Sequence, residues 1–441
     1  MILAPSRRAS LRTLDLAPAR PHPPPAPLPV LSRRSPRRGC QLEAAKAPPA
    51  DLRFCFSFKR RLRSRSKLIA AKRSRRGVDL ARVSVLLIAG MDVGLVQAIR
   101  FLPSRPERLA DTYRNFVDEA VSAEQLGIDF VWTTEHHFAF DGWMPAQLPV
   151  LSFIAARTSR LQLGTCLFLL PFHNPLRVAE DVAAIDLLSN GRFTGFAVGS
   201  GSDAGEFESY GLDPAERWGR LFEGLAIIRQ AFEKDQFDHS GKYFKFPNVQ
   251  MTTKPVQQPF PLWVGGFGKK LLERAGREGY HLQGGRDGID SYLQGLESSG
   301  YDESDFNYQV FYPGHVGRTF DHAWDEAQEG IYHYRDFYTN GRSITGTKRF
   351  VPPSPSDLRK EPNPPELVGS PETILRRLEP VLKNSRVTHF GLLHRMAGMS
   401  TEVSRSSLEL YAREILPVLK TWGRQPVQGM PTPRASTRAG S

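Results

Sequence analysis

The stretch that decides the fold is FVWTTEHHF, residues 130–138. It begins with residues that suit a buried strand, and it continues without a break into one carboxylate and two imidazoles. Titratable side chains directly after a buried strand are typical of an active site at the carboxyl ends of parallel strands. We therefore predict a strand that ends in the group Glu135, His136 and His137.

Short apolar runs alternate with longer segments of helical period from residue 91 to about residue 420. The predicted strands are residues 93–97, 128–134, 161–170, 192–198, 262–264, 280–283, 308–316 and 388–393. Strict alternation of eight strands with helices favours an α/β fold, the closed (β/α)8 TIM barrel. An open doubly wound sheet would need a glycine-rich turn after its first strand, and residues 97–105 contain no glycine.

Two insertions and a tail are expected beside the barrel of residues 91–420. Residues 241–252 resemble a hairpin, and residues 339–367 form an irregular, proline-rich stretch. Residues 421–441 are expected to form a disordered tail.

The positive charge of the chain is concentrated in its first 90 residues. The net charge is +13, with 59 Lys and Arg against 46 Asp and Glu. Residues 1–90 hold 21 of the basic and 4 of the acidic residues, which leaves 38 basic against 42 acidic residues in 91–441. The barrel region is therefore mildly acidic, and its composition gives no support to a nucleic-acid-binding role.

Residues 1–90 are rich in Arg, Pro and Ser and contain no apolar period long enough for a core. We expect a disordered basic leader, because such a segment cannot offset the entropy lost on ordering. A transit-like peptide has this composition, and residues 72–76 resemble a nuclear or nucleic-acid tract. The interpretation that we favour is that translation starts at Met91, directly before the first predicted strand.

The three cysteines, Cys40, Cys55 and Cys166, show no metal-ligand spacing. This usage is typical of a reducing compartment, so we expect a cytoplasmic protein. The sequence contains no run of about 18 apolar residues, so we expect no membrane-spanning helix.

The two histidines of the opening stretch are not equivalent. Neighbouring residues of an extended chain point to opposite faces, so His136 and His137 should face the same pocket only if the strand has already turned. Imidazole titrates near neutral pH and can move protons or stabilise a developing anion. We expect one histidine to act on a ligand and the other to support it; a hydrogen-bonded structural histidine is the alternative.

The Glu-His-His group could also supply metal ligands, and hydrolytic barrels generally take further His and Asp ligands from other strand ends. Here the strand ends at residues 199–201, 265–266 and 283–285 carry glycine instead. His315 and His394 are the exceptions, at the seventh and eighth strands. We predict no metal.

Two glycine-rich turns follow predicted strands, GSGS at residues 199–202 and GGFG at residues 265–268. Backbone amides without a Cβ, backed by a helix N-terminus, make a site suited to phosphate. Each turn alone is a weak signal, but two on neighbouring strands indicate a phosphate-bearing cofactor. The candidate residues for this role are Gly199, Ser200, Gly201, Arg217, Arg220, Gly265, Gly266, Phe267 and Gly268.

In this combination the chain resembles the bacterial luciferase-like, flavin-dependent monooxygenases over about residues 91–420. The segments that carry the resemblance are 124–127 with 130–132, 135–138, 163–166 with 171 and 174–175, 180–181, 187–192, 261–266 and 368–372. Individually they are modest, but their order and spacing are specific to the family.

The resemblance implies a barrel that binds reduced FMN and uses dioxygen to oxygenate an organic substrate. His136 matches the catalytic histidine of the family, with Glu135 and His137 in support. Cys166 and Leu167 match the place where the family often has a non-proline cis peptide beside the flavin. Residues 339–367 lie where luciferases carry a mobile lid.

One departure concerns the phosphate. Where luciferase itself has a phosphate-binding arginine after the fourth strand, this chain has Ser200. We therefore expect Arg217 or Arg220 to meet the phosphate charge. Light emission is not implied, because most relatives are dark oxygenases.

Our leading hypothesis is an FMN monooxygenase, expected as a homodimer, whose reduced flavin comes from a separate flavin reductase. A deazaflavin-dependent hydride-transfer enzyme is one alternative, and a flavin-binding subunit without catalysis is another. Several aromatic residues near strand ends suggest a small apolar substrate, although such residues are as often part of the core. They are Phe101, Phe138, Phe140, Trp143, Phe168 and Phe172.

Overall fold

The computed structural model describes residues 90–105, 108–284, 288–340, 354–361 and 365–432. The chain divides into two compact units, residues 1–79 and 80–441, and the described residues all belong to the second. The predicted leader lies outside the described residues except for Gly90, and so does much of the stretch predicted as a lid.

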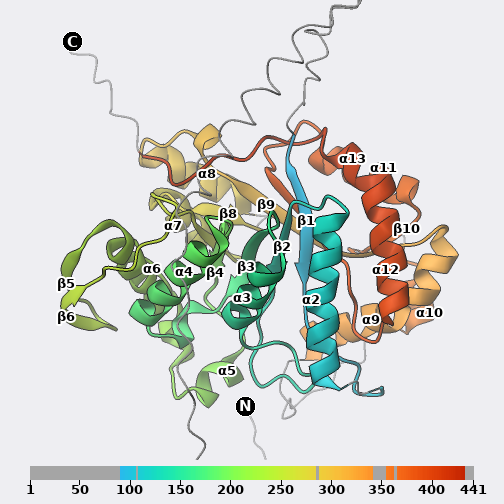
Figure 1. Cartoon of the computed structure of the whole chain (residues 1–441), viewed down its shortest axis with the longest axis horizontal. Coiled ribbons are helices and arrows are strands. Elements are labelled where there is room, and N and C mark those ends of the chain that lie inside the picture. The colour runs from blue at the N-terminus through green and yellow to red at the C-terminus, as the bar shows by residue number, and fades with distance from the viewer. Residues whose placement is uncertain (1–89, 106–107, 285–287, 341–353, 362–364, 433–441) are drawn as a thin grey trace, which may run out of the picture. The chain divides into compact units, whose positions relative to one another are not determined.

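Eight parallel strands close into a barrel, as the sequence predicts (Figure 1). They are β1 (Asp92–Gln97), β2 (Phe130–Thr133), β3 (Gln162–Phe168), β4 (Gly195–Val198), β7 (Leu262–Gly265), β8 (His281–Gln283), β9 (Tyr308–Val316) and β11 (His389–Leu393). Neighbouring strands pair in this order, β11 pairs with β1, and the β8–β9 pairing completes the ring. The closed (β/α)8 TIM barrel is therefore confirmed.

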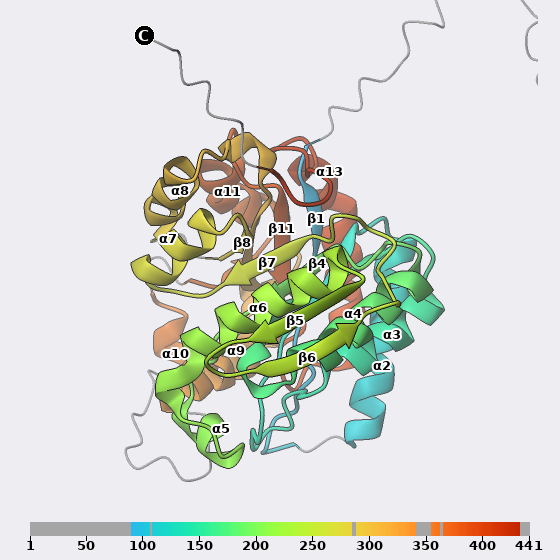
Figure 2. The same ribbon diagram turned by 90° about the vertical axis from the view of Figure 1, so that its left-hand side faces the viewer.

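Helices surround the strands, and several short helices and strands are inserted between the barrel elements (Figure 1). The helices are α2 (Leu109–Gln125), α3 (Gln147–Arg157), α4 (Pro175–Ser189), α5 (Ala204–Ser209), α6 (Arg217–Glu233), α7 (Lys269–Arg277), α8 (Ile289–Ser298), α9 (Phe320–Asn340), α10 (Pro355–Leu358), α11 (Pro371–Leu382), α12 (Thr401–Leu410) and α13 (Leu416–Leu419). A hairpin is formed by β5 (Gln236–Ser240) and β6 (Lys245–Gln250), which lie over α6 (Figure 2). It was predicted over residues 241–252, so its first strand begins earlier than expected. The elements that were not predicted include α5, α10 and the short strand β10 (Leu367–Gly369), which pairs with the end of β9.

Helix α4 shows how local sequence sets a boundary. The side chain of Asn174 accepts hydrogen bonds from the backbone amides of Leu176 and Arg177, and Pro175 occupies the first helical position. At the other end Asn190 adopts a left-handed conformation with a φ of 57° and stops the helix. Asn174, Pro175 and Asn190 thus set the two boundaries of α4.

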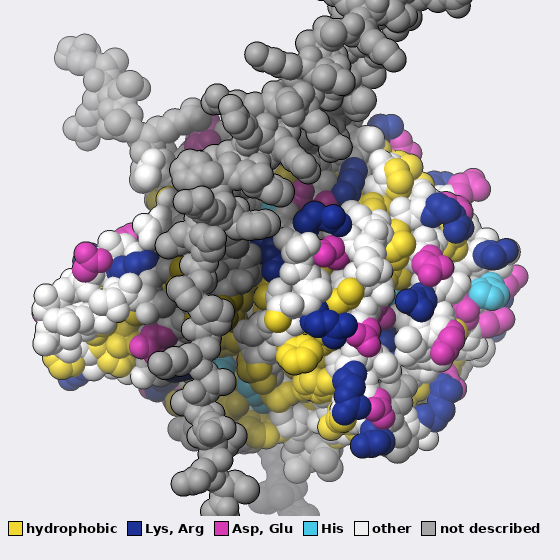
Figure 3. Space-filling view, viewed as in Figure 1, with side chains coloured by type: hydrophobic (Ala, Val, Ile, Leu, Met, Phe, Trp, Pro, Cys, Tyr) yellow, Lys and Arg dark blue, Asp and Glu magenta, His cyan; other side chains and the backbone are white. Residues whose placement is uncertain are grey.

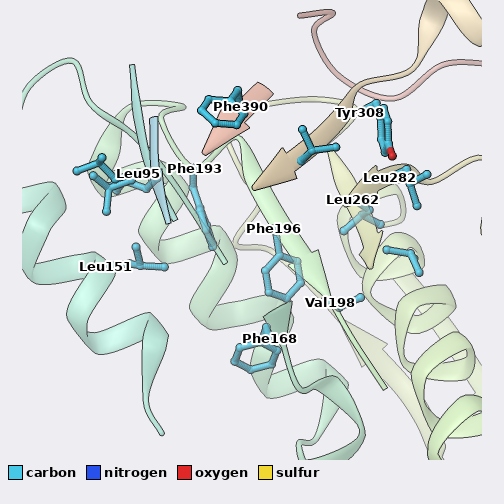
Figure 4. Close-up of a cluster of buried hydrophobic side chains, with 14 of the residues drawn as sticks. Leu95, Leu151, Phe168, Phe193, Phe196, Val198, Leu262, Leu282, Tyr308 and Phe390 are labelled. Atoms are coloured by element: carbon cyan, nitrogen blue, oxygen red, sulfur yellow. The ribbon is translucent and has the colours of Figure 1, made fainter. Parts of the chain in front are cut away.

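The hydrophobic core lies between the strands and the helices. Phe168, Phe196 and Leu262 belong to its strand side (Figure 4), and Leu151 contributes from α3. Outside the core, acidic and basic side chains are interspersed over α2 and its neighbours on the face that Figure 3 shows. This mixture of charges agrees with the nearly balanced, mildly acidic composition of the barrel region.

The inside of the barrel is filled by large rings. Trp132 on β2 and Trp263 on β7 are buried and meet edge to face, with ring centroids 5.1 Å apart. A Cβ atom at Gly164 would lie 2.4 Å from the Trp132 ring, and one at Gly195 would lie 2.2 Å from it. The glycines of β3 and β4 therefore make room for Trp132, which explains glycine inside strands.

The end of the chain corrects one prediction. Trp422 is buried, the backbone carbonyl of Val427 accepts a hydrogen bond from Asn307, and that of Gly429 lies 2.8 Å from His281 Nε2. Residues 421–432 are thus part of the packed body, and the prediction of a tail disordered from residue 421 was wrong for them. Within the described residues, no helix has the length and apolar character needed to cross a membrane.

Candidate active site

A cavity of about 730 Å³ lies at the carboxyl ends of the barrel strands. Its lining comes from the segments after β2, β4, β7 and β8, from β3, β9 and β11, and from α6 and α9. The lining residues include Thr134, Glu135, His136, Cys166, Leu167, Leu169, Ser200, Gly201, Ser202, Arg217, Trp218, Gly265, Gly266, Phe267, Gln283, Phe311, Tyr334, Arg335, Tyr338, Glu366 and Leu393. This end of the barrel is where enzymes of this fold carry their chemistry.

The opening stretch turns as it leaves the barrel. Strand β2 ends at Thr133, and Phe138 has a φ of 54°, so the chain between them is no longer extended. His136 lines the cavity, whereas His137 does not. The structure therefore separates the two histidines, one toward the cavity and one behind it.

His136 lies between groups from three other segments. Its Nδ1 is 3.2 Å from Oε1 of Glu206 on α5, and its Nε2 is 3.3 Å from the hydroxyl of Tyr338 on α9. The imidazole ring of His136 and the indole ring of Trp143 meet edge to face, with their centroids 4.5 Å apart. Glu206 and Tyr338 were not predicted, because neither follows a strand nor belongs to a recognisable motif.

Glu135 is the centre of a second, buried network. Nε2 of His137 donates to its Oε1 over 2.7 Å, Nε2 of Gln147 donates to its Oε2 over 2.8 Å, and Nε2 of His173 lies 3.7 Å away. Burial by itself would raise the pKa of Glu135, but the hydrogen bonds and charges of His137 and His173 hold this pKa below its ordinary value. Glu135 is therefore a carboxylate whose charge is met inside the protein.

Glu135, His137 and His173 are the one group within the described ranges whose ligand atoms, all within 4.8 Å of one another, could hold a metal ion. The hydrogen bonds from His137 and Gln147 account for the position of the carboxylate without one. The absence of a metal stays a prediction.

The peptide bond between Cys166 and Leu167 is cis, as the family resemblance implies. Nε2 of Gln147 donates to the carbonyl of Leu167 over 2.8 Å as well as to Glu135, and Gln283 donates to the sulfur of Cys166. Burial raises the pKa of the Cys166 thiol, so this side chain remains a neutral part of the wall. Gln147 joins the cis peptide to the Glu135 network, and this role was not predicted from the sequence.

The two predicted phosphate turns border the same cavity. Ser200, Gly201 and Ser202 line it after β4, and Gly265 at the end of β7 lines it together with Gly266 and Phe267 of the turn that follows. Gly201 and Gly266 have positive φ values of 71° and 137°, which favour glycine. Gly268, with a φ of 107°, immediately precedes α7, so the second turn leads into a helix N-terminus.

At two positions of the predicted turns, glycine is needed because a larger residue would collide with a neighbouring side chain. A Cβ atom at Gly199 would lie 2.7 Å from the Leu167 side chain, and one at Gly265 would lie 2.3 Å from it. These glycines let β4 and β7 pack against Leu167.

The two arginines that were predicted to meet the phosphate charge occupy different positions relative to the cavity. Arg217 lines the cavity at the start of α6, where its Nε donates to the carbonyl of Pro214. Arg220 does not line the cavity: it pairs with Glu216 at 2.9 Å and lies over the ring of Tyr243. The structure therefore gives no support to Arg220 as a ligand of the cavity.

A second arginine of the lining, Arg335 on α9, was not predicted. Its guanidinium pairs with Glu361 at 2.8 Å and with Glu366 at 2.6 Å, and these carboxylates raise its pKa. Its charge is therefore offset within the protein, while no acidic partner of Arg217 is found among the described residues. Arg217 is the better match for an anionic group.

The aromatic residues suggested for the substrate pocket lie elsewhere. Phe168 and Trp143 are buried in the protein, Phe138 is 59% exposed, and none of the six suggested residues lines the cavity. The aromatic part of the lining is formed instead by Trp218, Phe267, Phe311, Tyr334 and Tyr338.

Comparison with known proteins supports the family resemblance that the sequence shows. A model of the luciferase-like monooxygenase family matches residues 91–389. The oxygenase component of flavin-dependent trigonelline monooxygenase from Acinetobacter baylyi is 30% identical over 186 residues, 40% of this chain and 51% of that protein. An F420-dependent glucose-6-phosphate dehydrogenase from Amycolatopsis mediterranei is 33% identical over 173 residues, 38% of this chain and 51% of that protein.

Among solved structures, monooxygenase RslO1 from Streptomyces bottropensis matches with a TM-score of 0.64 at 20% identity. This match covers 74% of the chain and 99% of the solved chain, and it supports the fold. The alignments with the curated relatives named above span about half of each relative's length. Because the family model covers most of the barrel, the chain belongs to the luciferase-like monooxygenase family.

Proposed function

We propose that the protein is an FMN-dependent monooxygenase that uses reduced FMN and dioxygen to oxygenate a small apolar organic substrate. The observation that carries this proposal is that one cavity holds His136 and, on other strand ends, the phosphate turns with Arg217. An imidazole for proton transfer and a site for a phosphate are the two parts that such chemistry needs.

The residues of the cavity fit FMN. Backbone amides after β4 and β7 and the guanidinium of Arg217 would hold the phosphate, and Gly266 leaves the second turn without a Cβ. Cys166 and Leu167 would border the ring system. When bound, reduced FMN supplies two electrons to dioxygen, so that one oxygen atom enters the substrate and the other leaves as water.

The side chains have separate roles in this proposal. His136 would hold or move a proton at Nε2, the nitrogen that meets Tyr338. Glu135 and His137 would support the wall behind it, because their hydrogen bonds run to each other and to Gln147. Leu169, Phe311 and Leu393 would exclude water and bind the apolar substrate.

A separate flavin reductase would supply the reduced FMN. The trigonelline relative is named as an oxygenase component, which supports a two-component system. A cytoplasmic homodimer completes the proposal; cysteine usage supports the compartment, and the dimer rests on the family resemblance.

The second candidate is hydride transfer with the deazaflavin F420. It is favoured by the F420-dependent glucose-6-phosphate dehydrogenase, which aligns at 33% identity. The two candidates share the barrel and the histidine, so the cofactor separates them.

The test starts with purified protein titrated with FMN and with F420, followed by fluorescence. Reduced FMN is then mixed with dioxygen and with aldehydes, ketones and terpenes, and products are detected by mass spectrometry. We expect FMN binding and a product that carries one oxygen atom from ¹⁸O₂. Binding of F420 with anaerobic turnover would favour the second candidate. If the protein neither consumes oxygen nor turns over any substrate, a non-catalytic subunit would be indicated.

A His136→Ala variant tests the assigned role. Loss of proton transfer should lower product formation by about 10²-fold or more, whereas FMN binding should change little because His136 is not part of the phosphate turns. Unchanged turnover would rule out this role.

A further inference from the structure

Glu206 lies on a short helix that is firmly anchored. Asp203 caps α5 by accepting a hydrogen bond from the amide of Gly205, and Phe207 is buried against Phe172 with ring centroids 4.6 Å apart. The Glu206 side chain itself is 2% exposed. Its carboxylate is therefore held in one place beside the histidine stretch.

One oxygen of Glu206 meets two donors of that stretch. Oε1 lies 3.2 Å from Nδ1 of His136, and it accepts the backbone N–H of His137 over 3.0 Å. The second bond fixes the carboxylate relative to the main chain of the histidine it contacts. An ionised carboxylate can only accept, so Nδ1 of His136 must carry the hydrogen in this arrangement.

When the imidazole of His136 is neutral, its other nitrogen, Nε2, then carries no hydrogen and can accept. Nε2 lies 3.3 Å from the hydroxyl of Tyr338, which lines the cavity. A neutral imidazole with its hydrogen on Nδ1 has its basic nitrogen on the side of the cavity. With the opposite tautomer, Nε2 would be a donor and Nδ1 would face the carboxylate lone pair to lone pair.

Glu135, the acid next to His136 in the sequence, is not the residue that holds the hydrogen of His136 on Nδ1. Its two oxygens are engaged by His137 and Gln147. The structure thus assigns one acid to each histidine, Glu135 to His137 and Glu206 to His136.

We propose that Glu206 is a positioning residue that holds His136 in the Nδ1–H tautomer and so keeps Nε2 basic toward the cavity and Tyr338. This inference rests on the proposed function for its catalytic consequence, while the tautomer itself can be measured without any turnover.

The test uses the full chain with Glu206→Gln, Glu206→Asp and the control Glu208→Gln, which changes an exposed acid on the same helix. Nitrogen-15 NMR of histidine-labelled protein reads the tautomer, and the His136→Asn spectrum assigns the signal. We expect the Nδ1–H form in the wild type, in Glu206→Asp and in Glu208→Gln. Glu206→Gln should show a larger Nε2–H population than the wild type, because a neutral amide oxygen holds Nδ1–H less strongly than a carboxylate does.

The catalytic consequence is measured with the substrate found in the screen described above. Glu206→Gln should lower kcat by about 10- to 100-fold with KM and FMN binding within about twofold of the wild type, since the group acts through His136. Glu206→Asp should recover part of kcat, and Glu208→Gln should match the wild type.

Two results would overturn the inference: an Nε2–H tautomer in the wild type, or a Glu206→Gln variant with the wild-type tautomer and kcat. If Glu206→Gln does not fold, the wild-type spectrum and Glu206→Asp still decide. If the protein proves not to be an FMN monooxygenase, turnover fails for every variant alike, while the NMR result continues to test the tautomer.

Discussion

Nε2 of His137 donates to Oε1 of Glu135 over 2.7 Å, and both side chains are almost completely buried. Since this pair lies directly behind His136, its stability bears on the position of the histidine that faces the cavity. The arrangement leads to a prediction about acid stability.

The free energy of unfolding should fall as the pH drops below the ordinary Glu pKa of 4.5, because the folded-state pKa of Glu135 is lower than this value. A depressed pKa contributes stability that is present above the unfolded-state value and is lost as the pH falls through the folded-state value. Glu135→Gln should remove this part of the pH dependence. Urea unfolding of both proteins between pH 7 and pH 3 measures it, and equal slopes below pH 4.5 would contradict the prediction.

Gln147 should matter for both stability and the cavity wall. Its Nε2 donates to Glu135 and to the carbonyl of Leu167, so Gln147→Leu leaves two buried acceptors unsatisfied. We expect a loss of about 1–3 kcal/mol in the free energy of unfolding, together with weaker FMN binding. The exposed Gln294 on α8 provides the control Gln294→Leu, which should change neither quantity.

Arg217 and Arg220 make a matched pair. Arg217→Ala should weaken FMN binding by about 10- to 100-fold, the range expected when a charge-assisted hydrogen bond of about 1.5–3 kcal/mol is lost. Arg220→Ala should leave FMN binding within about twofold, because Arg220 pairs with Glu216 outside the cavity lining. Fluorescence titration measures both, and equal effects would contradict the assignment of the phosphate to Arg217.

The filled barrel interior predicts coupling between two positions. A Cβ atom at Gly164 would lie 2.4 Å from the Trp132 ring, so Gly164→Ala should destabilise the protein by about 1–3 kcal/mol. In a Trp132→Phe background the smaller ring should relieve part of this cost. Urea unfolding of the four proteins gives the coupling energy, and simple additivity would argue against a steric cause.

The sequence predicts the barrel well because alternating apolar runs and helical segments are local signals. It also predicts the cavity at Glu135 and His136 and the turns around Ser200 and Gly266. These features depend only on where strands end.

What the sequence does not predict is which side chains meet across the cavity. Glu206 and Tyr338 lie 70 and 202 residues beyond His136, and Gln147 lies 20 residues before Leu167. No periodicity or motif connects such positions, because the contacts form only when the barrel closes.

The unsupported role of Arg220 and the wrong prediction for residues 421–432 both have physical causes. Glu216 lies four residues before Arg220 on the same helical side, where it captures the guanidinium, and this spacing was visible in the sequence. Residues 421–432 have no apolar period of their own, but their backbone finds partners in Asn307 and His281.

The packed rings of Trp132 and Trp263 also limit the routes by which a ligand could reach the cavity. Because both rings are buried, they occupy the described barrel interior behind the cavity and obstruct the route through it. In the proposed monooxygenase, cofactor and substrate would therefore enter from the carboxyl ends of the strands, and the ligand that sits deeper would have to bind first.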